Sequence, residues 1–554
     1  SIVTDTRLLE RLRASMKGEV MDDAKTRALF ARDTSIFTKT PELVTYPKNA
    51  DDVSALVRTV LGARKDGINA SVTARSAGTD MSGGPLTDSV VAVFTKHMNQ
   101  VLEVGSGYAI TEPGVYYRDF EKATLASNRQ ILPSYPASRE IAAMGGIVNN
   151  DSGGERTLEY GKTRKYVEEV DVVLSDGSKV TFNAKSKEEL ERLCALETLE
   201  GRVYRDMRDL LAKNADAIEK ARPKVSKNSA GYALWEIEDK EAGTFNLAKL
   251  ICGAQGTLAL TTRMKLSLVR EQGYRAMLVV FLKDLEVLPE VVRKVLPFNP
   301  ESFESYDDHT FTLAMKLLPQ MLSQMGLAQA VHLGLSFIPE VGMAIKGGVP
   351  KLVLMAEFSE DTHQEALFKA GQARAALASL GLQTRIARDE RAAQKYWKVR
   401  REAFALLRKQ MPGLVAAPFI DDFVVPPDSY PEFLPKLFAL LDAEGFVYAV
   451  TGHIGDGNFH IFPLIDLSKP GSRQMILDLS PKVYDLVIKY GGSTTGEHND
   501  GIIRTPYLPQ LFGTEMVSLF EETKRIFDPM DIFNPGKKVN GTFADIERDM
   551  LRQV

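Results

Sequence analysis

The segment VTARSAGTDMSGG, residues 72–84, decides the fold of the first half of the chain, because a short apolar strand runs into a glycine-rich loop. A second glycine-rich segment, GGIVNNDSGG, occupies residues 145–154. Glycine has no Cβ, so consecutive backbone N–H groups can close on a phosphate and adopt positive φ. The two segments together indicate a pyrophosphate site.

Two common phosphate motifs are excluded. No G-x-G-x-x-G opens a helix after the first strand, which disfavours a Rossmann dinucleotide site. Residues 161–163 are Gly-Lys-Thr, but a Walker A loop needs glycine five residues before Gly161, where this chain has Arg156. The pyrophosphate site is therefore of another kind.

Hydrophobic periodicity predicts an α+β fold. Residues 43–67 predict a strand, an Asn or Asp cap and a helix, and Asp176–Gly177 predicts a hairpin turn. From about Gly273 a strand-then-helix pattern occurs three times, which suits a sheet with helices on one face. Residues 7–32 predict one or two amphipathic helices.

Composition is ordinary for a globular protein of about three domains, at ~100–200 residues per domain. Lys+Arg total 69 and Asp+Glu 73, and no run of five basic residues occurs, so we expect no nucleic-acid binding. Two distant cysteines, Cys194 and Cys252, exclude a disulfide scaffold and a four-cysteine iron–sulfur cluster. We expect a reducing compartment, the cytoplasm.

Membrane contact is left open by one segment. No run of ~18 consecutive apolar residues predicts a transmembrane helix, and the first residues lack the apolar region of a secretory signal. Residues 312–350 are rich in methionine and poor in charge. They predict a helical core element, and alternatively a patch that contacts a redox partner or the inner face of a membrane.

Three of the seven histidines, His453, His460 and His498, lie close together in the sequence. The first two flank a turn rich in Gly and Asp, so their imidazoles can face each other across a hairpin, and Glu497 precedes the third. Two histidines and a carboxylate with an open position are typical of a catalytic divalent site. The residues alone leave structural histidines equally open.

Six ordered motifs resemble the FAD-binding domain of the vanillyl-alcohol oxidase superfamily. They are VTARSAGTDMSGG at 72–84, EPGV at 112–115, PSYPAS at 133–138, GGIVNNDSGG at 145–154, YGKTRKYV at 160–167 and CGAQGTLAL at 252–260. The resemblance implies FAD contacts from Arg75, Ser76, Ala77, Gly78, Thr79, Asp80, Pro136, Ser138, Gly145, Gly146, Asn150, Gly153, Thr163 and Gly256. Some relatives attach FAD to a histidine near the position of Thr79, so non-covalent FAD is expected here.

Three later segments resemble the C-terminal FAD-linked oxidase domain shared by D-lactate, glycolate and D-2-hydroxyglutarate dehydrogenases. They are GHIGDGNFH at 452–460, GGSTTGEHNDG at 491–501 and TKRIFDPMDIFNPGKKV at 523–539. The resemblance implies that His453, His460 and Glu497 bind the metal and that His498 is the catalytic base. It also implies that Asn534 lies near the flavin and that Arg400, in YWKVRREAF at 396–404, binds the substrate carboxylate.

The resemblance also implies the domain order. We expect a helical segment at 1–41, a two-subdomain FAD-binding domain at 42–270, an α+β substrate domain with an antiparallel sheet and the metal site at 271–500, and a C-terminal helical segment at 501–554 that returns to the FAD domain.

The implied activity is FAD-linked oxidation of a small D-2-hydroxy acid, with Zn²⁺, Mn²⁺ or Fe²⁺ as the metal. Phe404, Ile420 and Phe462 are expected where hydroxyglutarate enzymes have polar groups, which favours D-lactate or another apolar acid. Electrons would pass to a quinone, a flavoprotein, a cytochrome or a separate iron–sulfur subunit. An O₂-using oxidase of an alcohol or sugar, a non-catalytic FAD subunit and a cofactor-free scaffold are the alternatives.

Overall fold

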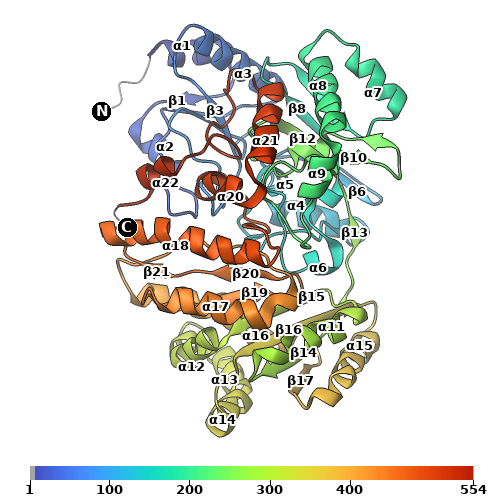
Figure 1. The fold of residues 1–554 in the computed structure, drawn as a ribbon, viewed down its shortest axis with the longest axis vertical. Coiled ribbons are helices and arrows are strands. Elements are labelled where there is room, and N and C mark those ends of the chain that lie inside the picture. The colour runs from blue at the N-terminus through green and yellow to red at the C-terminus, as the bar shows by residue number, and fades with distance from the viewer. Residues whose placement is uncertain (1–5, 553–554) are drawn as a thin grey trace.

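The computed structural model describes residues 6–552, without the side chains of Ala344, Ala403, Phe404, Leu406, Leu407, Arg408 and Gln410. Two large β-sheets with their helices form the upper part of the molecule, and a third, six-stranded sheet forms the lower part (Figure 1). Helices α20 (Leu508–Phe512) and α22 (Phe543–Asp549) of the C-terminal segment lie on the upper part (Figure 1). This is the predicted α+β architecture.

The first sheet has the strand order β1-β2-β4-β3. Its elements are α1 (Thr6–Ser15), β1 (Val20–Met21), α2 (Ala24–Leu29), β2 (Leu43–Thr45), α3 (Ala50–Lys65), β3 (Val72–Arg75) and β4 (Val90–Val93). The predicted helix is α3, where Asn49 caps the N-terminus and the apolar face is fully buried. The glycine-rich loop of residues 76–84 begins where β3 ends.

The second sheet has the order β5-β6-β12-β8-β9 and is antiparallel. Its strands are β5 (Val101–Gly105), β6 (Tyr108–Thr111), β8 (Val167–Val173), β9 (Lys179–Asn183) and β12 (Leu260–Ser267). The predicted Asp176–Gly177 turn joins β8 to β9, with Val173 paired to Lys179. Between β6 and β8 lie α4 (Tyr117–Ala126), α5 (Met144–Asn150) and α6 (Thr157–Tyr160).

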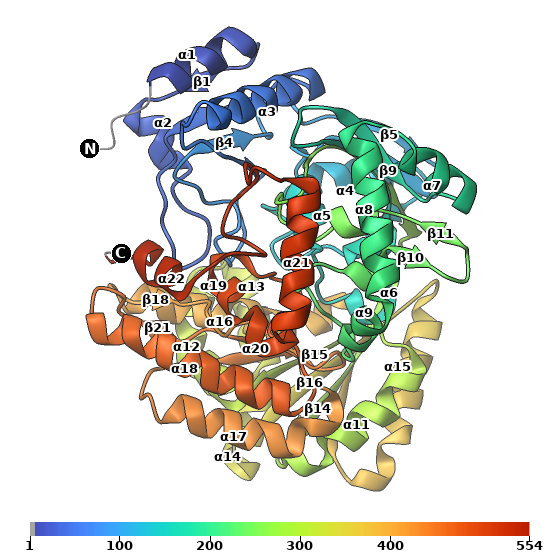
Figure 2. The same cartoon turned by 45° about the horizontal axis from the view of Figure 1, so that its top comes forward.

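The C-terminal segment returns to this part of the molecule, as predicted. Helix α21 (Thr514–Phe527) packs against α8 (Leu199–Lys213), and the two lie side by side in both views (Figures 1 and 2). Beyond α21, the Ile532 carbonyl accepts from Val72 N–H and Asn534 N–H donates to the Val72 carbonyl. Residues 532–534 therefore pair with the edge of β3.

The third sheet has the order β17-β14-β16-β15-β19-β20 and is antiparallel. Its strands are β14 (Tyr274–Leu282), β15 (Ser302–Asp307), β16 (Leu352–Glu360), β17 (Gln383–Ala387), β19 (Val450–His453) and β20 (Asn458–Ile461). Its main helices are α11 (Leu288–Val295), α12 (Asp308–Ser323), α15 (His363–Ala376), α16 (Glu390–Gln410), α17 (Tyr430–Asp442) and α18 (Pro470–Lys489).

Helices cover both faces of this sheet, so the prediction that they lie on one face is wrong. On β14, Leu278 and Val280 belong to the core that includes α11, α15 and α17, while Met277 and Val279 belong to the core that includes α12 and α16. Successive side chains of a strand point to opposite faces. The unbroken apolar run of β14 therefore needs cover on both sides.

Strands β19 and β20 form the predicted hairpin and carry His453 and His460. Gly457 lies in its turn with φ +74°, and a Cβ there would lie 1.7 Å from the Val425 carbonyl oxygen. Only glycine fits, because both the positive φ and the close approach exclude a side chain.

We expect Gly457→Ala to lower the free energy of unfolding by about 3 kcal/mol or more, because backbone strain and a steric clash add together. Gly445→Ala is the matched control: its φ is +75° but a Cβ would meet nothing within 4 Å, so it should cost only ~1–2 kcal/mol. Urea unfolding of both variants measures the difference, and equal losses would contradict the steric argument.

Candidate active site

A cavity of about 500 Å³ lies where the glycine-rich loops meet the third sheet. Most of the residues implied to contact FAD line it: Arg75, Ser76, Gly78, Thr79, Asp80, Pro136, Ser138, Gly145, Gly146, Asn150, Gly153 and Gly256. His453, His460, Glu497, His498 and Arg400 line the same cavity. The two predicted sites are thus parts of one space.

Three residues of the implied FAD set do not line this cavity. Asn534 is buried and its amide donates to the carbonyls of Gly84 and Gln255, so it braces the wall from behind. Thr163 donates to the Ser152 carbonyl at 2.8 Å and is also buried. Ala77 lies between lining residues without joining them.

The wall is built by close backbone approach. A Cβ at Gly145 would lie 2.7 Å from the Pro113 ring, so helix α5 begins against the segment 112–115. Gly146 N–H donates to the Ser76 hydroxyl at 3.0 Å, which joins the two glycine-rich segments. The Arg75 guanidinium donates to the carbonyls of Phe30 and Arg32 and thereby fixes the N-terminal loop to this wall.

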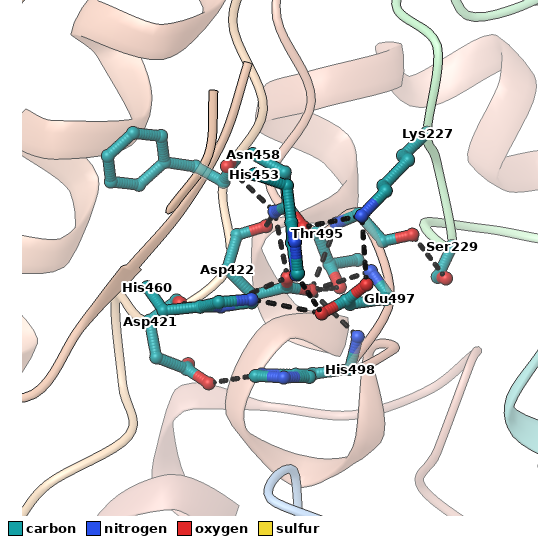
Figure 3. Close-up of polar contacts among 12 residues, drawn as sticks. Lys227, Ser229, Asp421, Asp422, His453, Asn458, His460, Thr495, Glu497 and His498 are labelled. Carbon is teal, nitrogen blue, oxygen red and sulfur yellow. Dashed lines mark hydrogen bonds and ion pairs between the residues drawn. The ribbon is translucent and has the colours of Figure 1, made fainter. Parts of the chain in front are cut away.

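At the other end of the cavity, the two imidazoles of the hairpin converge on Glu497 (Figure 3). His453 Nε2 lies 3.1 Å and His460 Nε2 2.9 Å from the same carboxylate oxygen. Each Nδ1 is occupied elsewhere, by a Glu304 carboxylate oxygen at 2.7 Å and by the Asp421 carbonyl at 2.9 Å. Fixing Nδ1 leaves Nε2 of both rings directed at one point.

Glu497 is held as a carboxylate by a buried lysine. Lys227 is 1% exposed and its ammonium lies 3.0 Å from the second oxygen of Glu497. Burial alone would raise the pKa of Glu497, but the charges of Lys227 and His453 bring this pKa well below its ordinary value. One oxygen is thus taken by Lys227 and the other faces the imidazoles.

Asp422 organises the loop that carries Glu497 and His498. One of its oxygens accepts from the backbone N–H groups of residues 496, 497 and 498 and from the Thr495 hydroxyl. Its other oxygen accepts from the Asn458 amide at 3.0 Å. Asp422 also lies within reach of His460, Glu497 and His498, but most of its hydrogen bonds hold the backbone of this loop.

His498 lies over His460 with the rings stacked at 4.8 Å between centroids (Figure 3). Its Nδ1 is 2.5 Å from Asp421, whose other oxygen pairs with the buried Arg504 at 2.8 Å. Burial favours the neutral imidazole, but the charges of Asp422 and Asp421 outweigh it and raise the pKa of His498 to about 9. Nε2 remains as the ring nitrogen available to the cavity.

Arg400 is nearly buried and only partly paired. Its Nη2 lies 3.2 Å from a Glu304 carboxylate oxygen as an ion pair without the alignment of a hydrogen bond. Its Nε also has no hydrogen-bond partner among the described residues. An unsatisfied buried guanidinium is costly unless a ligand completes it. Its fork geometry suits a carboxylate.

Sequence reasoning missed four residues of this site: Glu304, Lys227, Asp421 and Asp422. The adjacent acids Asp421 and Asp422 directly follow an apolar run, a signal that could have been used. Glu304 and Lys227 come from distant segments whose local sequence carries no such signal. Only the tertiary fold brings them together.

The three residues expected to shape the substrate pocket have three different outcomes in the structure. Phe462 lines the cavity. Ile420 does not, because it is fully buried in the hydrophobic core beneath the third sheet, so that expectation is wrong. The side chain of Phe404 lies outside the described ones. His97, the histidine closest in sequence to the first loop, pairs with Glu19 at 2.7 Å and does not line the cavity.

A cavity walled by two glycine-rich segments and closed by a second domain with a His–His–Glu cluster defines a two-domain flavoprotein architecture. Comparison with known families agrees: residues 41–183 match an FAD binding domain and residues 271–538 match the C-terminal domain of FAD linked oxidases. The chain therefore carries the two domains of FAD linked oxidases, an FAD binding domain followed by the C-terminal domain.

Curated relatives support this family. The chain is 29% identical over 539 residues to a D-2-hydroxyglutarate dehydrogenase of Pseudomonas putida, covering 96% of this chain and 51% of the relative. It is 26% identical over 499 residues to a D-lactate dehydrogenase of Archaeoglobus fulgidus, covering 90% and 91%. The chain thus spans about half the length of several relatives that it matches.

Solved structures confirm the fold class. A 4-ethylphenol oxidase from Gulosibacter chungangensis superposes with a TM-score of 0.68 at 17% identity, covering 98% of both chains. A p-cresol methylhydroxylase superposes with a TM-score of 0.67 at 13% identity, again covering 98% of both. At these identities the likeness concerns the fold alone.

We expect Asp422→Asn to lower the free energy of unfolding by about 2–4 kcal/mol, because a buried carboxylate that accepts several hydrogen bonds becomes a weaker acceptor with two new donors to satisfy. Asp428→Asn, at an exposed position, should stay within ~0.5 kcal/mol of the parent. Chemical denaturation checks both, and similar small effects would show that Asp422 does not hold the loop.

Proposed function

We propose that this protein oxidises a D-2-hydroxy acid to the 2-keto acid, with non-covalent FAD in the cavity and a divalent cation held by His453, His460 and Glu497. The observation that carries the proposal is the convergence of two imidazole Nε2 atoms and one carboxylate oxygen on the wall of the FAD-type cavity. The guanidinium of Arg400, which is paired only with Glu304, lies on the same wall.

The residues present fit FAD. The cavity volume suits a cofactor, its first wall is made of glycine backbone and small polar side chains, and such backbone can approach a pyrophosphate closely. When bound, FAD would supply the hydride acceptor. The chain's own part is to hold it, and to keep the braced loops of Gly84 and Gln255 in place through Asn534.

The residues also fit a divalent cation. Two neutral imidazoles and one carboxylate suit Zn²⁺, Mn²⁺ or Fe²⁺, and both imidazoles have the second-layer acceptors that orient metal-binding histidines. When bound, the cation would stabilise the developing alkoxide of the substrate. Lys227 leaves one oxygen of Glu497 for it.

His498 is proposed as the base that accepts the hydroxyl proton. Asp421 fixes its ring through Nδ1, so Nε2 can face a substrate in the cavity. A pKa of about 9 would leave the imidazole protonated at neutral pH. A nearby divalent positive charge disfavours the protonated form, so the cation would bring the base toward its working range.

Arg400 is proposed to hold the substrate carboxylate. A bidentate pair would satisfy Nε and Nη2, which have no hydrogen-bond partner among the described residues. Holding both the carboxylate and the hydroxyl would fix the Cα hydrogen toward the flavin, and such positioning contributes several kcal/mol to rate enhancement.

The names of the relatives support the substrate class. They are D-2-hydroxyglutarate dehydrogenases, a D-lactate dehydrogenase and glycolate oxidase subunits. Phe462 on the cavity wall favours a short or apolar acid of the D-lactate type. Arg401 also lines the cavity, where it is half-exposed and forms an ion pair with Glu155 at 3.3 Å. This second guanidinium favours a dicarboxylate instead.

We propose that a separate electron acceptor re-oxidises the flavin. Cys194 and Cys252 are both buried and are far apart in sequence, so they offer no cluster ligands. A quinone, a flavoprotein, a cytochrome or a separate iron–sulfur protein would re-oxidise the flavin.

Anaerobic mixing with D- and L-2-hydroxy acids tests the proposal. We expect the D-acid to bleach the flavin absorbance, the L-acid to leave it, and chelation to abolish bleaching until metal is restored. His453→Ala should keep the flavin and lose this reaction by at least ~10³-fold, as when a catalytic group is removed. Unchanged bleaching in His453→Ala would remove the metal from the mechanism, and rapid re-oxidation by air would favour an O₂-using oxidase.

Arginine-to-lysine variants distinguish the roles of Arg400 and Arg401 in the cavity. Arg400→Lys should raise KM for every 2-hydroxy acid by about 10²-fold, because a lysine cannot form the bidentate pair. Arg401→Lys is the matched neighbour. It should leave D-lactate unaffected and should weaken a dicarboxylate only if Arg401 binds the second carboxylate, so steady-state kinetics with both acids also decide the substrate class.

A further inference from the structure

A long insertion, residues 308–351, connects two residues that pair directly with each other in the third sheet. Asp307 at the end of β15 pairs with Leu352 at the start of β16, and residues 308–351 between them form α12, α13 (Leu327–Ser336) and α14 (Ile338–Gly347). These helices lie at the lower end of the molecule, away from the FAD domain (Figure 1). The insertion therefore starts and ends at one place on the sheet.

Helices α13 and α14 are apolar on two sides. Leu333 and Phe337 are buried against the core that contains Met277 and Tyr306. The opposite side carries an exposed apolar stripe with residues three or four apart: Leu327, Val331, Leu335, Ile338, Val341, Ile345 and Val349. A helix covered by protein on one apolar side and exposed on the other marks an interaction surface.

The stripe is concentrated and not a random scatter of apolar residues. Its members are seven of the 17 exposed large apolar side chains in the described part of the chain. Leu327 is 83% and Ile345 79% exposed. The stretch Leu327–Gly347 also has the length and composition of a membrane-crossing helix, although polar residues such as His332 and Glu340 interrupt its apolar run.

Within residues 309–350 the exposed charges are of one sign. From His309 to Pro350 the sequence has a single carboxylate, Glu340, which is buried and paired with Lys395 at 2.8 Å. Lys346 is exposed beside Ile345, and the Lys283 ammonium lies next to Gly347 at the end of α14. Cations beside an apolar stripe complement the anionic surface of a bilayer.

We propose that this stripe binds the surface of an anionic lipid bilayer, with the two helices lying in the plane of the headgroups. The segment lies on the bilayer and does not cross it, because its two ends return to paired residues of one sheet. A single crossing would leave one end on the far side. Each ten-residue helix is also only ~15 Å long, half of a hydrocarbon core.

Vesicle flotation of the FAD-loaded full chain tests this inference independently of turnover. We expect the protein to float with vesicles of phosphatidylglycerol and phosphatidylcholine and to bind vesicles of phosphatidylcholine alone at least about tenfold more weakly. The double change Leu335→Gln and Ile345→Gln should weaken binding to the mixed vesicles by about tenfold or more, because two apolar side chains no longer enter the lipid.

Two further variants serve as controls. The double change Lys283→Glu and Lys346→Glu should abolish the preference for the anionic vesicles, because these two cations no longer attract the surface. Phe368→Gln, at a 65% exposed apolar position on α15, should bind as the parent does. An unchanged flavin spectrum and melting temperature in each variant would show that the fold is intact.

Failure to float with the anionic vesicles overturns the proposal, as does binding that the Leu335→Gln and Ile345→Gln changes leave intact. Analytical sedimentation tests the alternative that a second copy of the chain binds the stripe. A concentration-dependent dimer that those two changes abolish, without vesicle binding, would assign the stripe to self-association instead.

Discussion

The Asp422 carboxylate accepts hydrogen bonds from three successive backbone N–H groups and from Thr495, and the positions of Glu497 and His498 depend on that interaction. The loop at residues 495–498 has no strand or long helix to fix it. A buried acceptor that satisfies several donors at once gives such a loop one conformation. Glu497 and His498 then face the hairpin of β19 and β20, which is rigid because it is part of a sheet.

Compensated burial of charge is the second constraint. Glu497, Lys227, Glu304 and Asp421 are all buried, and each has an ionic partner of opposite charge or an imidazole. Removing any one of these partners would leave an unpaired buried charge, which is destabilising by several kcal/mol. The network therefore stabilises the fold only as a complete set, and it keeps the two domains in contact at the cavity.

Much of this could be predicted from the sequence, and the exceptions have physical causes. The glycine-rich loops and the His453–His460 hairpin were predictable because short-range patterns encode them. The cover on both faces of the third sheet was misjudged, although the unbroken apolar run of β14 signalled it. Ile420 was misplaced because its burial in the core of the third sheet is set by packing with segments distant in sequence. Glu304 and Lys227 lie far from the motifs in sequence.

Glu304 touches the guanidinium of Arg400 on one side and the imidazole of His453 on the other. A substrate carboxylate that draws the Arg400 guanidinium away from Glu304 would strengthen the attraction between Glu304 and the His453 imidazole. A cation bound to that imidazole would likewise change the attraction between Glu304 and the guanidinium. By thermodynamic reciprocity such influence has equal size in both directions. Binding of the acid and binding of the cation would then be coupled through the Glu304 side chain.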